Sequence, residues 1–173
     1  KTFSMTAYYD SMISNWFHRD QGDQVNNFSS AGKLSSTLRY GENPHQSAGL
    51  YKSSQHRSGI PYATLLQGKE LSYNNINDSD AALQLIKEFD QNVPTVAIIK
   101  HANPCGVASA SSLSDAYLKA FSCDTTSAFG GIIAANQIID EDTAKEIIKI
   151  FTEVIIAPGI SDEAEKIFKT KNN

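Results

Sequence analysis

Cysteine is scarce in this chain. Its 173 residues include two cysteines, Cys105 and Cys123, and no CxxC pair. Disulfide-stabilised domains carry more cysteines than this, because each bridge consumes two of them. The scarcity argues against a disulfide framework and favours a reducing compartment, so we expect a cytoplasmic protein.

Long apolar runs and an excess of positive charge are also missing. No apolar stretch reaches the roughly 20 residues that span a bilayer, and the N-terminal segment lacks the layout of a secretory signal. Sequence-independent nucleic-acid binders are usually basic, whereas this chain has a net charge of -4 and a pI near 5.5. We therefore expect neither a membrane nor a nucleic-acid partner. Because the chain begins with Lys and not Met, we also expect it to be processed or cut from a longer polypeptide.

Helical and strand-like segments alternate along most of the chain. Apolar side chains at helical spacing predict a helix over 6–17, and the polar stretch 18–36 is typical of a linker. Further helices are expected where apolar side chains recur at helical spacing between β-prone runs. Those runs predict strands at 48–51, 95–99, 130–138 and 153–158. This alternation predicts an α/β fold, a layered sheet with helices on both faces.

Capping residues give the expected helix starts. Asp78 or Ser79 is predicted to cap the helix that ends near residue 89. Ser112 is predicted to cap the next helix, and a further helix is predicted over 141–151. Ser161 is predicted to cap the last helix.

The segment AIIKHANPCG, residues 97–106, places a cation and an imidazole directly after an apolar strand. Ligands in open α/β sheets bind beyond the carboxyl ends of strands. Neighbouring strand residues point to opposite faces, so Lys100 and His101 reach one site only if the strand ends there. The pair Asn103-Pro104, followed by Gly106, predicts a turn at this point.

Lys100 and His101 suit a reaction in which a proton leaves and an oxyanion develops. Histidine is the natural general base near neutral pH. Lysine stabilises negative charge or keeps a neighbouring imidazole neutral. The alternative is structural: Lys100 extends from a strand end to solvent and His101 makes a hydrogen bond. For a single Lys-His pair, this structural alternative is the commoner case.

A zinc site with His101 and Cys105 as ligands is a third alternative. Zinc deaminases combine H-x-E with PC-x-x-C. Here Asn103 occupies the glutamate position and Ala108 the position of the second cysteine. We therefore expect no metal.

Two other segments carry side chains or glycines suited to a ligand. In LRYGENPHQ (38–46), Arg39 offers a planar fork of donors for phosphate or carboxylate, and Tyr40 adds a hydroxyl. In SAFGG (127–131), two glycines permit close approach of a ligand to backbone N–H groups. Each segment alone is equally compatible with a surface turn or loop.

Together, LRYGENPHQ, IIKHANPCG and SAFGGIIAAN resemble, in the same order, the AICAR transformylase region of the bifunctional purine biosynthesis enzymes. LQGKELSYNNINDSDAA and TEVIIAPGIS are similar to that family too. The resemblance predicts that 1–37 holds the tail of a preceding IMP cyclohydrolase domain and a linker. It predicts that 38–173 is the first subdomain of the transformylase region, a fragment.

The resemblance implies formyl transfer from 10-formyltetrahydrofolate, a co-substrate, to the 5-amino group of AICAR ribonucleotide. The product, FAICAR, is cyclised to IMP by the other domain. The resemblance also implies a cytidine deaminase-like α/β fold without zinc, and a homodimer with sites across the subunit interface. Because the family's folate site lies largely in a later segment, we expect little or no turnover by this chain alone.

The resemblance also assigns roles to individual residues. His101 is implied as the base that takes the proton from the attacking amine, with Lys100 assisting. Arg39 and Tyr40 match the nucleotide-binding pair of the family, with the Arg facing the phosphate. The remaining matches are Gly130 against the substrate, Glu153 where the family often carries Asp to contact the nucleotide, and Asn103 behind the site. A non-catalytic nucleotide-binding or dimerisation module and a zinc hydrolase remain rival hypotheses.

Overall fold

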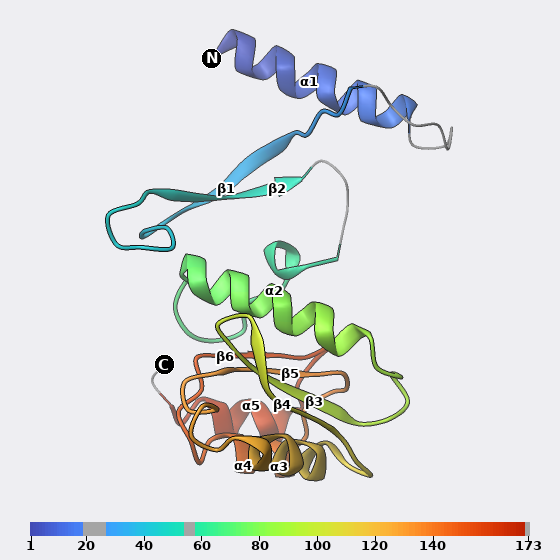
Figure 1. The fold of residues 1–173 in the computed structure, drawn as a ribbon, viewed down its shortest axis with the longest axis vertical. Helices are drawn as coiled ribbons and strands as arrows, with labels where there is room; N and C mark the ends of the chain where they lie inside the picture. The colour runs from blue at the N-terminus through green and yellow to red at the C-terminus, as the bar shows by residue number, and fades with distance from the viewer. Residues whose placement is uncertain (19–26, 54–57, 172–173) are drawn as a thin grey trace.

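The structure is a computed structural model, and it describes residues 1–18, 27–53 and 58–171. Helices alternate with single strands or pairs of strands along the chain, in line with the predicted alternation (Figure 1). In chain order they are α1 (Thr2–Phe17), β1 (Gly32–Leu38), β2 (Ala48–Ser53), the 3-10 turn η1 (Ile60–Tyr62), α2 (Tyr73–Lys87), β3 (Thr95–Lys100), β4 (Asn103–Ser109), α3 (Leu113–Cys123), β5 (Ile132–Ala135), α4 (Glu141–Ile147), β6 (Val154–Ile156) and α5 (Asp162–Phe168).

The main sheet has four strands in the order β4-β3-β5-β6. β3 runs antiparallel to both of its neighbours, and β5 runs parallel to β6. All residues of β3 before Lys100 are buried, which confirms the predicted strand buried on both faces. The three strands predicted at 95–99, 130–138 and 153–158 are confirmed in position, and β4 is an addition that the sequence pattern did not predict.

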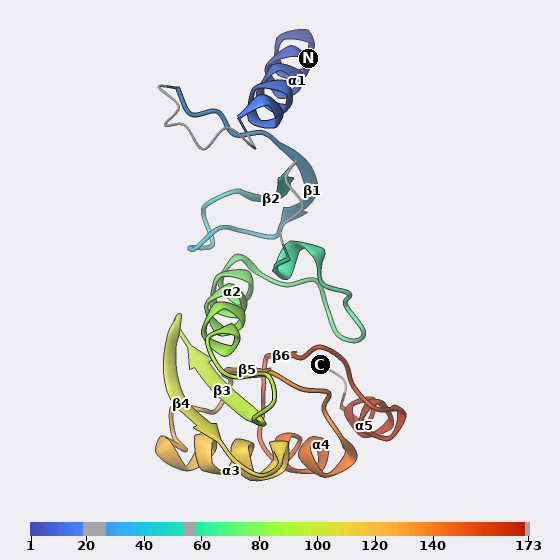
Figure 2. The same ribbon diagram turned by 90° about the vertical axis from the view of Figure 1, so that its right-hand side faces the viewer.

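Helices cover both faces of this sheet, as predicted (Figure 2). Val96 and Ile98 of β3 pack into a cluster with α3, α4 and α5. Ala97 and Ile99 point the other way and pack against α2. The layered α/β fold class is therefore confirmed, because successive residues of a strand alternate between the two faces.

The turn predicted at Asn103-Pro104 is wrong: these residues begin strand β4. Ile98 pairs with Gly106 and Ile99 with Pro104, which leaves Cys105 unpaired as a bulge. β4 is an edge strand, where a proline is tolerated because its missing N–H faces away from the sheet. Pro104 and Gly106 thus mark a bulged edge strand, and the chain reverses before them, at residues 101–102.

The predicted cap at Asp78 or Ser79 is also wrong. α2 begins at Tyr73, and Ser72 caps it together with Asn75. The first turns of α2 are polar, so an apolar periodicity does not reveal them. The caps predicted at Ser112 and Ser161 are confirmed, and α4 ends at Ile147, earlier than predicted.

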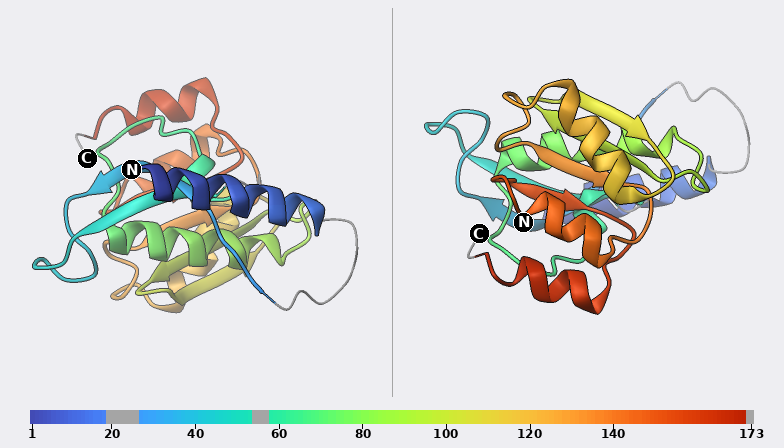
Figure 3. Two further views of the ribbon diagram at one scale, coloured as in Figure 1. Left: turned by 90° about the horizontal axis from the view of Figure 1, so that it is seen from above. Right: turned by 90° about the horizontal axis from the view of Figure 1, so that it is seen from below.

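The N-terminal part lies beyond α2, on the side away from the main sheet (Figures 1 and 3). The helix predicted over 6–17 is confirmed as α1, yet none of its side chains is buried, and Trp16 is 66% exposed. β1 begins at Gly32, inside the stretch 18–36 that was predicted as a linker. Residues 19–26 of that stretch lie outside the described residues. The domain boundary predicted after residue 37 falls inside β1 and stays a prediction. No helix in the described part of the chain is long and apolar enough to cross a membrane.

Asn136 fixes the loop that leads into β3. Its Oδ1 accepts a hydrogen bond from Thr95 N at 2.8 Å, and its Nδ2 donates to Asp90 O and Val93 O at 3.0 and 2.8 Å. The residue is 5% exposed. Groups left unpaired by its removal would be shielded from water, and each such group costs about 1–3 kcal/mol.

We therefore expect Asn136→Ala to lower the free energy of unfolding by about 2–4 kcal/mol in urea titrations. The matched control is Gln137→Ala, which removes one hydrogen bond to Gln91 O. It should change stability by less than about 1 kcal/mol. A loss for Asn136→Ala no larger than that of the control would contradict the assignment.

Candidate active site

The site begins at the two-residue loop that joins β3 to β4. Lys100 pairs with Asn103 across the hairpin, so His101 and Ala102 form its tip. Both tip residues have left-handed backbones, with φ of 53° and 57°. That conformation costs a non-glycine residue about 1–2 kcal/mol, so contacts outside the loop must hold it.

Asp78 of α2 supplies those contacts. Its Oδ2 accepts from His101 N and its Oδ1 from Ala102 N, each at 3.0 Å. On the opposite side of the loop, Asn103 Nδ2 donates to His101 O at 2.8 Å. Sequence reasoning assigned Asn103 to a supporting position, and it missed the role of Asp78.

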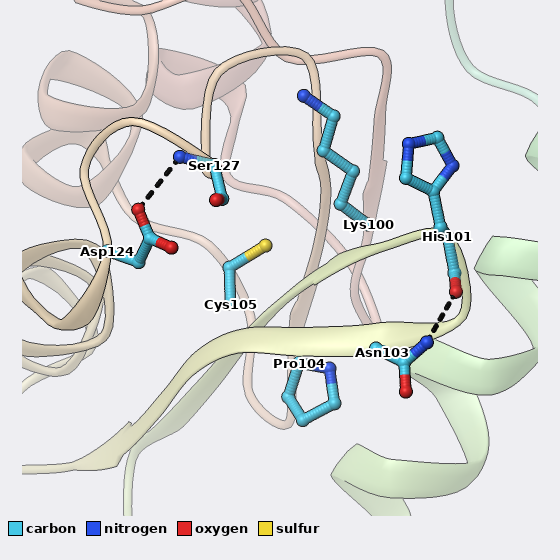
Figure 4. Close-up of a pocket in the computed structure, with 7 residues that line it drawn as sticks. All are labelled: Lys100, His101, Asn103, Pro104, Cys105, Asp124 and Ser127. Carbon is cyan, nitrogen blue, oxygen red and sulfur yellow. Dashed lines mark hydrogen bonds between the residues drawn. The ribbon is translucent and has the colours of Figure 1, made fainter.

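Lys100 and His101 border one pocket of about 240 Å³ (Figure 4). The figure shows both side chains leaving the same side of the turn. Both side chains thus reach one pocket at the point where β3 ends, and their catalytic roles stay a prediction. The pocket is lined by Lys100, His101, Asn103, Pro104, Cys105, Asp124 and Ser127.

Lys100 connects the turn to the SAFGG segment. Its Nζ donates to Phe129 O at 2.8 Å. The same segment contains Gly130, whose φ of 70° is left-handed and suits glycine. Gly130 N donates to Phe151 O at 2.8 Å, so Phe129 and Gly130 are each held by a contact from another part of the chain.

Two further ionisable groups face Lys100 in the pocket. Hydrogen bonds from the backbone and side chain of Ser127 lower the pKa of the Asp124 carboxyl, with a smaller contribution from the charge of Lys100. Burial raises the pKa of the Cys105 thiol, the negative charge of Asp124 adds to the effect, and Lys100 opposes it. The pocket therefore holds a carboxylate and a neutral thiol beside the lysine. Asp124 and Ser127 were missed, and their only sequence signal is a polar turn before the glycines.

The four residues predicted to bind a nucleotide do not line this pocket; they are Arg39, Tyr40, Gly130 and Glu153. The guanidinium of Arg39 stands 5.3 Å from the ring centroid of Tyr40, and Arg39 is exposed. Asn74 Nδ2 donates to Glu42 O at 3.4 Å, which ties their loop to α2. Glu153 is exposed, and its carboxylate accepts a hydrogen bond from Asn75.

The first half of α2 is thus the common support of three predicted segments. Asn74 contacts the loop that carries Arg39, Asn75 contacts Glu153, and Asp78 holds the turn of His101. These side chains project from one rigid helix whose far face is buried at Ser79 and Ala82. The mostly polar residues SYNNIND, at 72–78, therefore begin the helix and also hold these three segments.

Metal-ligating groups are sparse around the pocket. Among the described residues, no group of three or more His, Cys, Asp or Glu side chains is arranged to hold a metal ion. His101 and Cys105, the two ligands considered from the sequence, both line the pocket.

Comparison with known proteins places this chain in a family. The family model described as the AICARFT/IMPCHase bienzyme matches residues 1–173. The chain belongs to the AICARFT/IMPCHase family. The resemblance inferred from the motifs is thereby confirmed, and the match also includes the N-terminal part that precedes residue 38.

Curated members of the AICARFT/IMPCHase family are similar to the chain along its whole length. The bifunctional purine biosynthesis protein PurH of Brucella anthropi is 57% identical over 175 residues, with 100% of this chain covered. The proteins of the same name from Brucella abortus and Brucella ovis have the same identity and coverage. The chain spans 32% of the length of these relatives.

Proposed function

We propose that this chain forms the nucleotide-binding and catalytic part of an AICAR transformylase in de novo purine biosynthesis. The reaction would move a formyl group from 10-formyltetrahydrofolate to the 5-amino group of AICAR ribonucleotide. FAICAR would then be closed to IMP by a cyclohydrolase domain of the complete protein. The single observation that carries this proposal is the placement of Lys100 and His101 on one pocket at the end of β3.

The chemistry requires a weakly basic amine to attack a formyl carbonyl. The amine nitrogen would form a C–N bond to the formyl carbon. As this bond forms, His101 would take the proton that the amine loses. Lys100 would stabilise the oxyanion of the tetrahedral intermediate, whose collapse breaks the bond to the folate nitrogen. That nitrogen recovers a proton, so the reaction needs neither a metal nor a covalent enzyme intermediate.

The other predicted residues would bind the nucleotide. Arg39 would pair with the phosphate, beside the hydroxyl of Tyr40, and Gly130 and Glu153 would contact the rest of the substrate. The support for this arrangement is that α2, which holds the turn of His101, also contacts Glu153 and the loop that follows Arg39 and Tyr40. The folate site would be formed by residues outside this chain. The complete protein would be a homodimer, and the reaction would take place in the cytoplasm.

Phosphate recognition by Arg39 gives a direct test of this proposal. The test protein is a hybrid enzyme, the full-length Brucella anthropi relative with its matching segment replaced by this chain. In calorimetric titrations with AICAR ribonucleotide, Arg39→Ala should raise Kd about 10–100-fold, because a hydrogen bond to a charged group contributes about 1.5–3 kcal/mol. The unphosphorylated riboside should bind weakly to both proteins.

Lys33→Ala is the matched control, since Lys33 is an exposed cation on the same strand that leads to Arg39. It should leave Kd within about twofold. Equal affinity of wild type and Arg39→Ala for the ribonucleotide would refute the assignment of Arg39 as the residue that binds the phosphate. Titrating the chain alone then shows whether the nucleotide site is formed without the missing segments.

A further inference from the structure

The loop that carries His101 is locally unfavourable. Two-residue hairpin loops with positive φ at both positions strongly prefer Asn-Gly and related pairs. Here the pair is His-Ala, and both residues adopt left-handed backbones against their own steric preference. Strained backbone of this kind persists only where its surroundings over-determine it.

Asp78 is positioned to impose this conformation. Successive backbone N–H groups in a turn can form a concave site for an anion, and the N–H groups of His101 and Ala102 both donate to the carboxylate of Asp78. Hydrogen bonds to a charged acceptor are roughly twice as strong as neutral ones. Asp78 lies on α2, which is anchored against the sheet through Ala82 and Ile86, so the turn is held against a rigid element.

The contact determines where the imidazole of His101 lies. Asn103 holds the carbonyl of His101, but the two N–H groups are held by Asp78. Without the carboxylate, both tip residues would relax toward negative φ, and the imidazole would move away from Lys100. A misplacement of about 1 Å can lower a rate about 100-fold.

We propose that Asp78 is the positioning residue for His101, acting through the backbone of the turn and not on the substrate. The proposal rests on the proposed function in one respect, the assignment of His101 as general base. It makes Asp78 a determinant of kcat, while nucleotide affinity is set by other residues.

The test is Asp78→Asn in the hybrid enzyme. The amide keeps the size of the side chain, but its NH2 group faces one of the two backbone donors. We expect kcat to fall about 10–100-fold and Kd for AICAR ribonucleotide to change less than about threefold. Asp80→Asn is the control, because Asp80 is an exposed carboxylate on the same helix, and it should keep kcat within about twofold.

A rescue experiment separates backbone positioning from a direct effect of charge. Glycine adopts the left-handed conformation without a steric penalty. Adding Ala102→Gly to Asp78→Asn should therefore restore kcat at least about fivefold, a larger gain than the same change produces in the wild-type background. If Ala102→Gly restores nothing, or if Asp78→Asn retains kcat within about twofold, the proposal is overturned.

Amide hydrogen exchange on the chain itself gives a readout independent of activity. Wild-type His101 and Ala102 N–H groups should be protected, and Asp78→Asn should raise their exchange rates about tenfold. Unchanged protection in both the β3 amides and the turn amides would overturn the proposal. Loss of protection confined to the turn supports it. Should His101→Ala leave turnover unchanged, the proposed function fails, and the exchange data still decide whether Asp78 holds the turn.

Discussion

Replacing His101 with alanine in the hybrid enzyme should lower the kcat of formyl transfer about 10²–10⁴-fold, the usual contribution of a positioned general base. The side chain is exposed and borders the pocket beside Lys100, so its removal leaves no cavity in the core. Stability should therefore stay within about 0.5 kcal/mol of wild type. The loss would be chemical, measured by single-turnover kinetics at saturating nucleotide and folate.

His18→Ala is the matched control, because His18 is also exposed but lies at the end of α1, far from β3 along the chain. It should keep kcat within about twofold. If His101→Ala matched that control, the chain would be a non-catalytic nucleotide-binding or dimerisation module. A zinc hydrolase is the other rival, and it requires stoichiometric metal by elemental analysis of the purified protein.

Gly106→Ala should be the most destabilising single methyl addition in the core. A Cβ at this position would lie 1.9 Å from Ala120 O and 2.9 Å from Ala120 C, with Cys123 Cβ at 3.0 Å. The obstacle is helix backbone and not a flexible side-chain end, so β4 and α3 must separate for the methyl group to fit. We expect the free energy of unfolding to fall by about 3 kcal/mol or more, with the midpoint of thermal unfolding lower by about 6–12 °C.

Gly159→Ala is the control for this substitution. Its added Cβ would meet only Ile138 Cγ1, at an ordinary distance of 3.7 Å. That change should lie within about 0.5 kcal/mol of wild type. Urea titrations at neutral pH measure both variants, and a Gly106→Ala protein as stable as Gly159→Ala would show that β4 and α3 do not approach this closely.

The strands of the main sheet were predictable because burial on both faces leaves a simple pattern. Thr95–Ile99 is a continuous apolar, β-branched run, and the runs that became β5 and β6 are similar. The caps at Ser112 and Ser161 were predictable because each side chain accepts from a backbone N–H only three residues ahead. Such contacts are local, so the letters that make them stand close together.

Edge strand β4 was not predictable in the same way. Asn103, Pro104 and Gly106 carry turn-forming preferences, and only pairing with β3 draws them into a bulged edge. The start of α2 was missed for a related reason. Its first turns are polar because Asn74, Asn75 and Asp78 make hydrogen bonds to other segments, so no apolar periodicity marks them.

The sequence by itself determined the family of this protein and three of the four strands of its main sheet. A Lys-His pair at the end of a buried strand, together with the other motifs in the right order, was sufficient for the family, because these motifs are short and local in the sequence. Tertiary structure alone decided how that pair is presented. Asp78 lies 23 residues before His101, and its carboxylate is brought beneath the turn only when α2 packs on β3. A left-handed His-Ala turn has no local sequence signal, because local preferences oppose it and a contact from another element sustains it.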